Sequence, residues 1–265
     1  MAVDVVTPYD FLTFDEVRAE PPTAGVSTCT LLSIIVPVYN EERTVAELLR
    51  RVMQIPIAKE VLVVDDGSTD GTARQIDSVP GVKVLRHDRN RGKGAAIRTA
   101  LSVAKGDAMI IQDADLEYDP AEIPALLERY QVGDVDDVFG SRILGSDSRG
   151  DFIYYWGGRA VTLLTRLLYG SAITDEATCY KLIGTELLRS FGLRAAGFDF
   201  CAELTAAILA SGGQIAEVPI SYRPRTRAEG KKISWRDGII TVLTLLQARF
   251  QRSPLSSRKA VRVEL

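Results

Sequence analysis

The stretch Ala108-Met109-Ile110-Ile111-Gln112-Asp113-Ala114-Asp115-Leu116-Glu117 joins four apolar residues to a segment that carries three carboxylates. The apolar run predicts a buried strand. Asp113 and Asp115 follow that strand, and side chains two residues apart point the same way in extended chain. Two carboxylates in a pocket of low dielectric repel each other unless a cation lies between them. The stretch therefore indicates a divalent-cation site; the alternative is a polar turn leading to a helix that starts at Pro120.

Apolar, β-branched runs alternate with helical patterns throughout the first half of the chain. Strands are predicted at Leu32–Val38, 61–64, 82–85, Ala108–Ile111 and 136–140, and helices at 41–53, 95–104 and 121–130. Nearly continuous Val and Ile runs that alternate with helices form a parallel sheet covered on both faces. The predicted fold class is therefore α/β, with a Rossmann-like, mainly parallel sheet, helices on both faces and a smaller C-terminal region.

The second half of the chain has a less regular pattern. Helices are predicted at 153–169, Phe200–Ala210 and Trp235–Phe250, and strands at 177–183 and 215–220. Apolar residues cover more than half the circumference of the last helix. Core packing is the favoured explanation, and an interfacial helix flanked by Arg236, Arg249 and Arg252 is the alternative.

The composition is that of one globular domain. The chain has 265 residues, of which 46% are hydrophobic and 25% charged, and a net charge of -3, so no nucleic-acid partner is expected. We expect a poorly ordered arm at 1–30 with a short helix near 14–20, a single domain at 31–252, and a basic tail at 253–265. Residues 223–262 contain eleven Lys or Arg and two acids. This excess indicates an anionic ligand or membrane surface, or simply a solvated tail.

Three features predict a cytoplasmic location. The cysteines Cys29, Cys179 and Cys201 are odd in number and lack metal-type spacing, which fits a reducing compartment. The first residues do not have the pattern of a secretory signal. No apolar run approaches the ~20 residues that span a bilayer. We therefore expect a protein that touches a membrane without crossing it.

Ligands of parallel α/β sheets bind beyond the carboxyl ends of the strands, which here are followed by the loops 38–42, 65–70, 90–94 and 112–117. The first of these loops contains no glycine, which argues against dinucleotide binding of the dehydrogenase type. Asp65 and Asp66 can accept hydrogen bonds from a base or ribose. For Ser68 and Asp70, capping of the following helix is the favoured role.

The stretch Arg91-Gly92-Lys93-Gly94 opens a helix. Free backbone N–H groups, the positive end of the helix dipole and two cations together predict an anion site that suits a diphosphate. A metal at Asp113 and Asp115 would bridge that diphosphate, with Glu117 as a third oxygen ligand or a ligand through water.

Four ordered motifs carry a resemblance to a known family. They are Ile35-Val36-Pro37-Val38-Tyr39-Asn40-Glu41-Glu42, Val63-Val64-Asp65-Asp66-Gly67-Ser68-Thr69-Asp70-Gly71-Thr72, Asn90-Arg91-Gly92-Lys93-Gly94 and Gln112-Asp113-Ala114-Asp115. Over residues 31–250 the chain resembles the inverting family 2 glycosyltransferases of GT-A fold. Within that family it is most similar to the polyprenol-phosphate (dolichol-phosphate) mannosyl- and glucosyltransferases. This closer likeness depends on Phe139-Gly140-Ser141-Arg142, Cys179-Tyr180-Lys181 and Glu229-Gly230-Lys231-Lys232-Ile233, among other short stretches.

The resemblance implies roles for individual residues. The nucleoside would be held by Pro37, Tyr39, Glu41 and Asp66, with Asp65 beside them. Mg²⁺ or Mn²⁺ would be held by Asp113, Asp115 and Glu117, although relatives often have Gln at the last position. The donor diphosphate and the acceptor phosphate would face Lys93, Arg142, Arg159 and Lys232. The residues expected to be catalytic are Asp115, Arg142 and Lys232.

The resemblance also implies a reaction. A hexose, mannose or glucose, would move from a donor of the GDP-mannose or UDP-glucose type to a polyprenyl phosphate, as in a dolichyl-phosphate β-mannosyltransferase. Residues 31–142 would form the nucleotide-sugar half and residues 143–252 the acceptor half. The enzyme would lie peripherally on the cytoplasmic, inner face of the membrane and contact lipid through helices 153–169 and Trp235–Phe250 and the basic tail.

Two alternatives stay open. The acceptor can instead be a sugar hydroxyl of a glycan or cell-wall precursor, which would need a general base. Asp175, Asp199 and Glu203 are the candidates for that base, or else buried structural carboxylates. A more remote alternative is a sugar-nucleotide sensor without activity. His87 is expected to be a neutral loop residue, and Tyr180 and Trp235 are expected to be packed.

Overall fold

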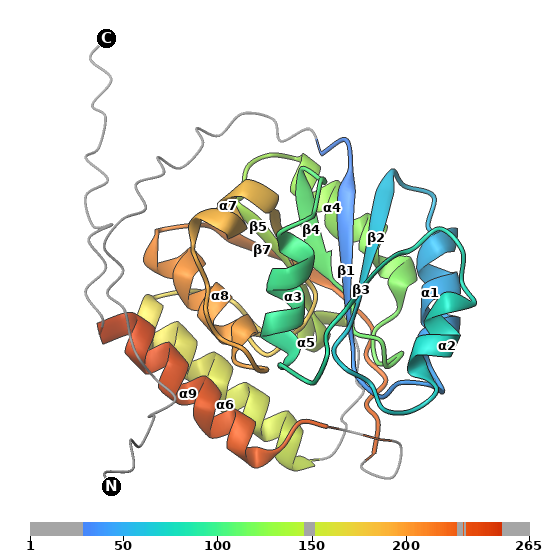
Figure 1. Ribbon diagram of the computed structural model, residues 1–265. Coiled ribbons are helices and arrows are strands. Elements are labelled where there is room, and N and C mark those ends of the chain that lie inside the picture. The colour runs from blue at the N-terminus through green and yellow to red at the C-terminus, as the bar shows by residue number, and fades with distance from the viewer. Residues whose placement is uncertain (1–28, 146–151, 227–229, 231, 251–265) are drawn as a thin grey trace, which may run out of the picture.

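The structure is a computed structural model that describes residues 29–145, 152–226, 230 and 232–250 (Figure 1). The predictions of an N-terminal arm, of a helix near 14–20 and of a basic tail at 253–265 therefore lie almost entirely outside the described residues.

The described residues contain one seven-stranded sheet with the strand order β3-β2-β1-β4-β6-β5-β7. The strands are β1 Leu32–Val38, β2 Lys59–Asp65, β3 Lys83–Arg86, β4 Ala108–Ile111, β5 Asp137–Ser141, β6 Lys181–Gly184 and β7 Ile215–Pro219. Only β6 runs antiparallel, between β4 and β5. The prediction of a mainly parallel α/β sheet is confirmed, while the strand expected at 177–183 begins only at Lys181.

Helices cover both faces of the sheet, as predicted. They are α1 Val45–Gln54, α2 Thr72–Asp77, α3 Lys93–Leu101, α4 Ile123–Gln131, α5 Arg142–Gly145, α6 Phe152–Tyr169, α7 Thr185–Ser190, α8 Phe200–Ala210 and α9 Trp235–Phe250. Because neighbouring side chains of β1 alternate between faces, Ile34 packs in the core with α1, and Ile35 packs with α3 and α8. A short 3-10 helix, Pro120–Glu122, leads into α4 at the predicted place.

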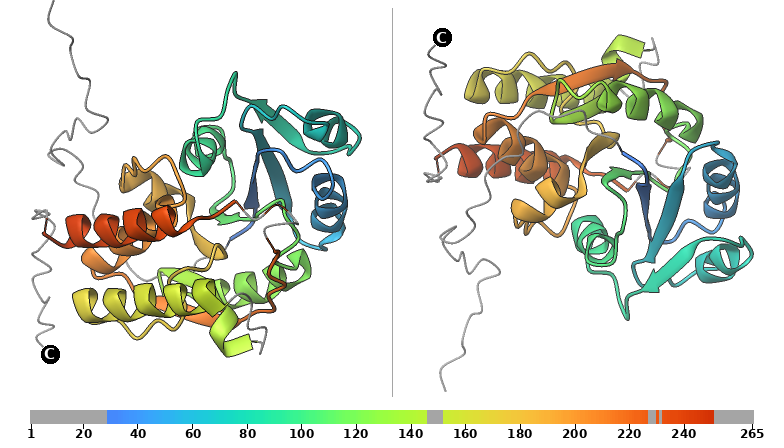
Figure 2. Two further views of the ribbon diagram at one scale, coloured as in Figure 1. Left: turned by 90° about the horizontal axis from the view of Figure 1, so that it is seen from below. Right: turned by 90° about the horizontal axis from the view of Figure 1, so that it is seen from above.

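Helices α6 and α9 lie side by side at one end of the molecule, away from α1 and α2 (Figure 2). The Tyr169 hydroxyl donates to the Leu245 carbonyl oxygen at 3.0 Å, which joins the two helices. In α9, Leu245 is buried, whereas Ile239, Leu243 and other apolar side chains are largely exposed. Core packing therefore explains only part of the apolar surface of α9.

Two aromatic residues, Tyr180 and Trp235, are predicted from the sequence to pack in the interior. Tyr180 is fully buried, as predicted. Trp235 is 64% exposed, so the prediction of a packed Trp235 is wrong. It is the first residue of α9, and the apolar side chains of Ile239 and Leu243 in the same helix are exposed as well.

Lys181 is a buried residue of β6 that joins this strand to α8 through hydrogen bonds. The Lys181 ammonium donates to the Cys201 carbonyl at 3.0 Å and to the Thr205 hydroxyl at 2.6 Å, and lies 3.5 Å from a carboxylate oxygen of Glu176. It also stands 4.7 Å from the centre of the Phe139 ring. A buried charge of this kind is tolerated only while its partners are present.

We predict that Lys181→Ala lowers the free energy of unfolding by about 3–5 kcal/mol, because the Glu176 carboxylate stays buried without its cation. Denaturant unfolding at neutral pH measures this change. Lys105→Ala removes an exposed lysine from the same protein and should change the free energy by less than about 0.5 kcal/mol. A loss below about 1 kcal/mol for Lys181→Ala would contradict the assigned role.

Candidate functional site

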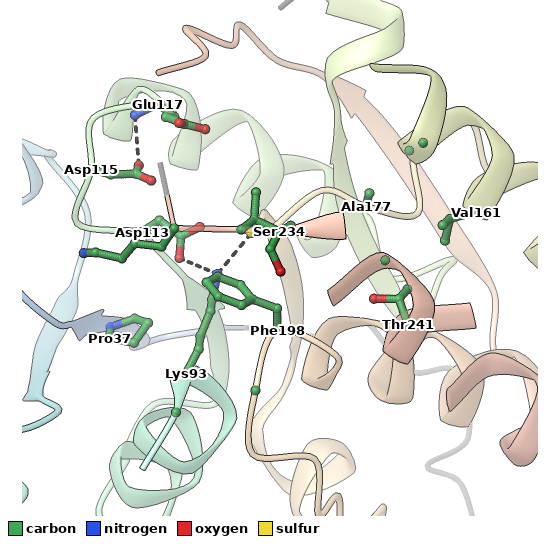
Figure 3. A pocket seen from close by; sticks show the side chains of 18 of the residues that line it. Pro37, Lys93, Asp113, Asp115, Glu117, Val161, Ala177, Phe198, Ser234 and Thr241 are labelled. Atoms are coloured by element: carbon green, nitrogen blue, oxygen red, sulfur yellow. Dashed lines mark hydrogen bonds and ion pairs between the residues drawn. The ribbon is translucent and has the colours of Figure 1, made fainter. Parts of the chain in front are cut away.

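A cavity of about 1290 Å³ opens beyond the carboxyl ends of β1, β2 and β4 (Figure 3). All four loops that the sequence analysis singled out contribute to its lining, together with α6 and α9. The lining includes ten of the predicted site residues: Pro37, Tyr39, Glu41, Asp66, Lys93, Asp113, Asp115, Glu117, Arg142 and Lys232. Asp65 and Arg159 are not among the described residues that line it.

Of the two aspartates at the end of β2, Asp65 and Asp66, it is Asp66 whose carboxylate lines the cavity. Its oxygens accept the backbone N–H groups of Arg91 and Gly92 at 2.9 and 2.8 Å. These two N–H groups are therefore bonded within the protein and are not free for an anion, contrary to what the sequence predicts for the helix start. Asp65 instead accepts the Ser68 N–H at 3.0 Å, which shapes the loop.

His87 lies in the loop directly after β3, as expected, but its side chain is packed inside the protein. Its side chain is buried, with Nδ1 2.6 Å from an Asp66 oxygen and Nε2 2.9 Å from the Thr99 hydroxyl. A hydrogen bond on each ring nitrogen fixes the imidazole and thereby orients Asp66. The sequence placed His87 at the end of the third strand but did not show that this end packs against α3.

Lys93, the first residue of α3, points across the cavity to Asp113 (Figure 3). The ammonium lies 2.5 Å from an Asp113 oxygen and 3.1 Å from the Cys179 sulfur. Although burial alone would raise the pKa of Asp113, the charge of Lys93 holds it below its usual value. Asp113 is therefore a carboxylate at neutral pH, with Lys93 beside it.

The chain turns directly after β4. The strand ends at Ile111, and Leu116 adopts a φ of 62°, a left-handed conformation that costs a non-glycine residue of order 1–3 kcal/mol. The expectation that Asp113, Asp115 and Glu117 share one side of an extended chain is therefore wrong. The turn directs Asp115 and Glu117 toward residues 222–225, while Asp113 faces Lys93 (Figure 3).

Arg225 joins three carboxylates at this turn. Its guanidinium lies 2.9 Å from Glu41, 3.0 Å from Asp115 and 3.5 Å from Glu117. Lys232 contacts the same Glu41 at 2.6 Å and also donates to the carbonyl oxygens of the 39–40 loop. In the sequence, Arg225 is only one cation of a basic segment, and this role could not be recognised there. Its sole sequence signal was a cation beside Pro224, in the loop that leads to Lys232.

Glu117 holds the segment 222–225 in place through hydrogen bonds. One carboxylate oxygen accepts the Tyr222 hydroxyl, and the other accepts the Arg225 backbone N–H at 3.0 Å. The Glu117 carbonyl also accepts the Arg223 N–H at 2.9 Å. These bonds fasten residues 222–225 to the turn and leave Glu117 less open to a metal than Asp113 or Asp115.

The donor set and charge of the turn suit a hard divalent cation. Carboxylate oxygens are preferred by Mg²⁺ and Mn²⁺. Burial, with repulsion from Asp113 and Glu117, raises the pKa of Asp115 to about 7, although the charge of Arg225 lowers it. Among the described residues, no group of three or more His, Cys, Asp or Glu side chains is already arranged around one metal position. Asp113 and Asp115 thus fit the metal, and Glu117 does so less well.

Arg142 forms a second cationic position. Its Nε and Nη2 lie 2.7 Å from the two oxygens of Asp175, and its guanidinium stands 5.0 Å from the centre of the Tyr222 ring. Asp175 is buried, and Glu217 accepts its backbone N–H at 3.0 Å. The pair fixes a planar cation at the cavity wall, with donors left over for an anion.

The three carboxylates considered as a general base have structural partners. Asp175 pairs with Arg142, and Asp199 accepts the Gly197 N–H at 3.1 Å. Glu203 accepts the N–H groups of residues 194 and 195, and burial raises its pKa. None of the three is among the described residues that line the cavity.

The other half of the cavity is apolar and lies between α6 and α9. Its lining includes Val161, Leu164, Ala177, Trp235, Ile239 and Val242. Beside it, exposed apolar side chains such as Leu163 and Leu167 continue over the surface of α6. Within the described part of the chain, no helix combines the length and apolarity needed to cross a bilayer.

Curated relatives share this sequence over most of its length. The chain is 36% identical over 219 residues to an undecaprenyl-phosphate 4-deoxy-4-formamido-L-arabinose transferase of Pseudomonas aeruginosa, covering 78% of the chain and 61% of the relative. It is 28% identical over 209 residues to a dolichol-phosphate mannosyltransferase of Pyrococcus furiosus, covering 76% and 58%. A hexosyltransferase of low-salt glycan biosynthesis from Haloferax volcanii is 30% identical over 214 residues, covering 78% and 51%. The chain thus spans between half and two thirds of these relatives.

Solved structures share the fold. Glucosyl-3-phosphoglycerate synthase of Mycobacterium tuberculosis, in complex with Mn²⁺, UDP and glucosyl-3-phosphoglycerate, superposes with a TM-score of 0.66 at 21% identity and covers 88% of this chain and 86% of its own. Mannosyl-3-phosphoglycerate synthase of Rubrobacter xylanophilus gives the same TM-score and identity, covering 83% and 72%. The family model of "Glycosyl transferase family 2" matches residues 33–192. The chain therefore belongs to glycosyltransferase family 2 and has its GT-A fold.

Proposed function

We propose that this protein is a metal-dependent, inverting hexosyltransferase that moves mannose or glucose from a nucleoside-diphosphate sugar to a polyprenyl phosphate at the cytoplasmic face of a membrane. The observation that carries the proposal is the two-part cavity. Its polar half contains the carboxylates and cations of the strand ends, and its apolar half runs between α6 and α9. An acceptor with a charged head and a hydrocarbon chain matches both halves.

The polar half suits the donor. Pro37, Tyr39 and Asp66 line it where a nucleoside would lie, and Asp113 and Asp115 lie where the diphosphate and its metal would lie. A solved structure of similar fold binds Mn²⁺ and UDP-glucose. A bound Mg²⁺ or Mn²⁺ would stabilise the negative charge of the departing nucleoside diphosphate. Lys93 adds a fixed positive charge beside Asp113.

The acceptor side favours a phosphate over a hydroxyl. A phosphate is already anionic and needs no base, whereas a hydroxyl must lose a proton. Asp175, Asp199 and Glu203 are engaged elsewhere, and none is among the described residues that line the cavity. Arg142 offers its guanidinium at the wall between the two halves. The names of two relatives, which act with undecaprenyl phosphate and dolichol phosphate, support the same choice.

The proposed location rests on two observations. The three cysteines are unpaired, which suits a reducing compartment. The exposed apolar side chains of α6 and α9 lie beside the mouth of the apolar half, so a lipid acceptor can enter without leaving its bilayer.

The first prediction concerns the reaction. With Mg²⁺ or Mn²⁺ and polyprenyl phosphate, radiolabelled sugar from GDP-mannose or UDP-glucose should appear in the organic phase. Arg142→Gln should lower kcat/KM for the lipid phosphate by about 10²–10³-fold, since it removes a fixed cation at the developing bond. Arg159→Gln is the matched control and should cost less than about threefold, because Arg159 does not line the cavity.

Three results of that assay would count against the proposal. Transfer only to water-soluble glycans would favour a hydroxyl acceptor. Binding of the donor without any transfer would favour a sensor. Equal losses in the two arginine variants would remove Arg142 from the acceptor site.

The second prediction concerns pH and metal. Since the pKa of Asp115 is raised to about 7, its carboxyl holds a proton below that pH, and a metal must displace this proton. With UDP-glucose or GDP-mannose present, Mn²⁺ affinity should fall about fivefold from pH 7 to pH 6 and change little above pH 8. Isothermal titration measures the affinity. The Asp115→Asn variant should show no such pH dependence of Mn²⁺ affinity, and its turnover should be lower by about 10²–10³-fold. If the Mn²⁺ affinity of the wild type does not change with pH, Asp115 is not a metal ligand.

The third prediction concerns lipid contact. Leu167 is 75% exposed on α6 and lies outside the cavity lining. Leu167→Glu should lower partitioning onto phosphatidylglycerol-containing vesicles by about tenfold or more, because an apolar contact is lost and a like charge is gained. Val132→Glu places the same charge at a 62% exposed site after α4 and should have little effect. Equal binding by both variants would contradict contact through α6.

A further inference from the structure

Arg225 occupies an unusual position for a cation in a metal-dependent site. Its guanidinium Nη2 lies 3.0 Å from Asp115 and 3.1 Å from Glu41, and only 14% of its side chain is exposed. Asp115 is one of the two carboxylates that best fit the divalent ion. Arg225 therefore neutralises the same oxygens that the metal needs.

The side chain of Arg225 is not what anchors its segment. Backbone N–H groups of Arg223 and Arg225 bond to Glu117, and the Tyr222 hydroxyl bonds to the same carboxylate. These contacts hold the loop against the turn whatever side chain stands at position 225. The segment is held in place by these hydrogen bonds, so the guanidinium adds positive charge there without being needed to position the loop.

Charge balance indicates when this cation leaves Asp115. Four carboxylates (Glu41, Asp113, Asp115, Glu117) pair with three cations (Lys93, Arg225, Lys232) in the polar half of the cavity, where a fifth carboxylate, Asp66, accepts backbone N–H groups. A divalent ion that arrives alone must compete with Arg225 for Asp115 and is repelled by it. A nucleoside diphosphate brings phosphate oxygens that a guanidinium binds well. When the nucleoside diphosphate is bound, its phosphate oxygens can accept hydrogen bonds from Arg225, and Asp115 is then available to the metal.

We propose that Arg225 is a built-in counter-cation that competes with the divalent ion for Asp115, so that the metal binds well only together with the nucleoside diphosphate. This inference rests on the proposed metal-dependent function. It makes Arg225 a positioning residue that sets the order of ligand binding.

The test measures Mn²⁺ affinity of the full-length protein from the electron paramagnetic resonance signal of free Mn²⁺, with no acceptor present. Because a charge within ~4–6 Å shifts a neighbouring ionic equilibrium by one to three powers of ten, nucleotide-free Arg225→Gln should bind Mn²⁺ about tenfold more tightly than wild type. Arg225→Lys keeps the charge and should stay within about threefold of wild type. With UDP or GDP present, the advantage of Arg225→Gln should shrink to below about threefold.

The matched control is Arg223→Gln. Arg223 is exposed, and its removal changes the net charge equally without touching the four carboxylates, so Mn²⁺ affinity should stay within about twofold of wild type. Thermal unfolding in EDTA verifies that each variant is folded. Added Mn²⁺ should then raise the Tm of Arg225→Gln more than that of wild type, because a ligand of the folded state stabilises it.

Two sets of results would overturn the inference, and they are distinguishable. If wild type binds Mn²⁺ with a nucleoside diphosphate, but Arg225→Gln binds Mn²⁺ alone no better than wild type or Arg223→Gln, only the role of Arg225 fails. If neither wild type nor any variant binds Mn²⁺ with or without UDP and GDP, the metal-dependent function fails with it.

Discussion

The repulsion among carboxylates at one edge of the sheet is the constraint on which the site depends. Because β1 and β4 are neighbours, the loops that follow them bring Glu41 close to Asp113 and Asp115. Like charges this close in a partly buried cavity destabilise the folded chain unless cations join them. Lys93, Arg225 and Lys232 supply those cations from α3 and from the late loop. The charge of the proposed diphosphate and metal site therefore also draws distant parts of the chain together.

The same constraint explains why the two halves of the chain are coupled. Residues 222–232 are far in sequence from the strand ends, yet Glu117 bonds to Tyr222 and Arg225, and Glu41 pairs with Lys232. Past this loop the chain enters α9, which packs with α6 beside the apolar half of the cavity. Lys232, which pairs with Glu41, thus lies three residues before α9, one of the helices that border the proposed lipid entrance.

Much of the fold could be predicted because the decisive signals are local. Continuous apolar runs gave β1 and β4 to the residue, and the loops after parallel strands had to meet at one edge. The antiparallel insertion of β6 could not be predicted, since its short apolar run does not encode direction. Nor could the left-handed Leu116, because leucine carries no local preference for a positive φ and the turn is imposed by tertiary contacts. The turn that begins at Ala114, after Asp113, gives Asp113 and Asp115 separate directions and brings Asp115 to Arg225.

The partners of each side chain distinguish the residues that hold the site together from those left open to ligands. Asp66 and Glu117 have both carboxylate oxygens bonded to backbone N–H groups or a hydroxyl, so they act by placing their neighbours. Asp113 pairs with Lys93, and one Asp115 oxygen pairs with Arg225 while the other accepts the Glu117 N–H at 3.0 Å. Cations such as Lys93 and Arg225 can be exchanged for other cations. If Asp115 exchanges Arg225 for a metal as proposed, the cluster stays stable before the donor binds and releases its carboxylates afterwards. Sequence motifs mark both kinds of residue alike, and only the geometry of their partners separates them.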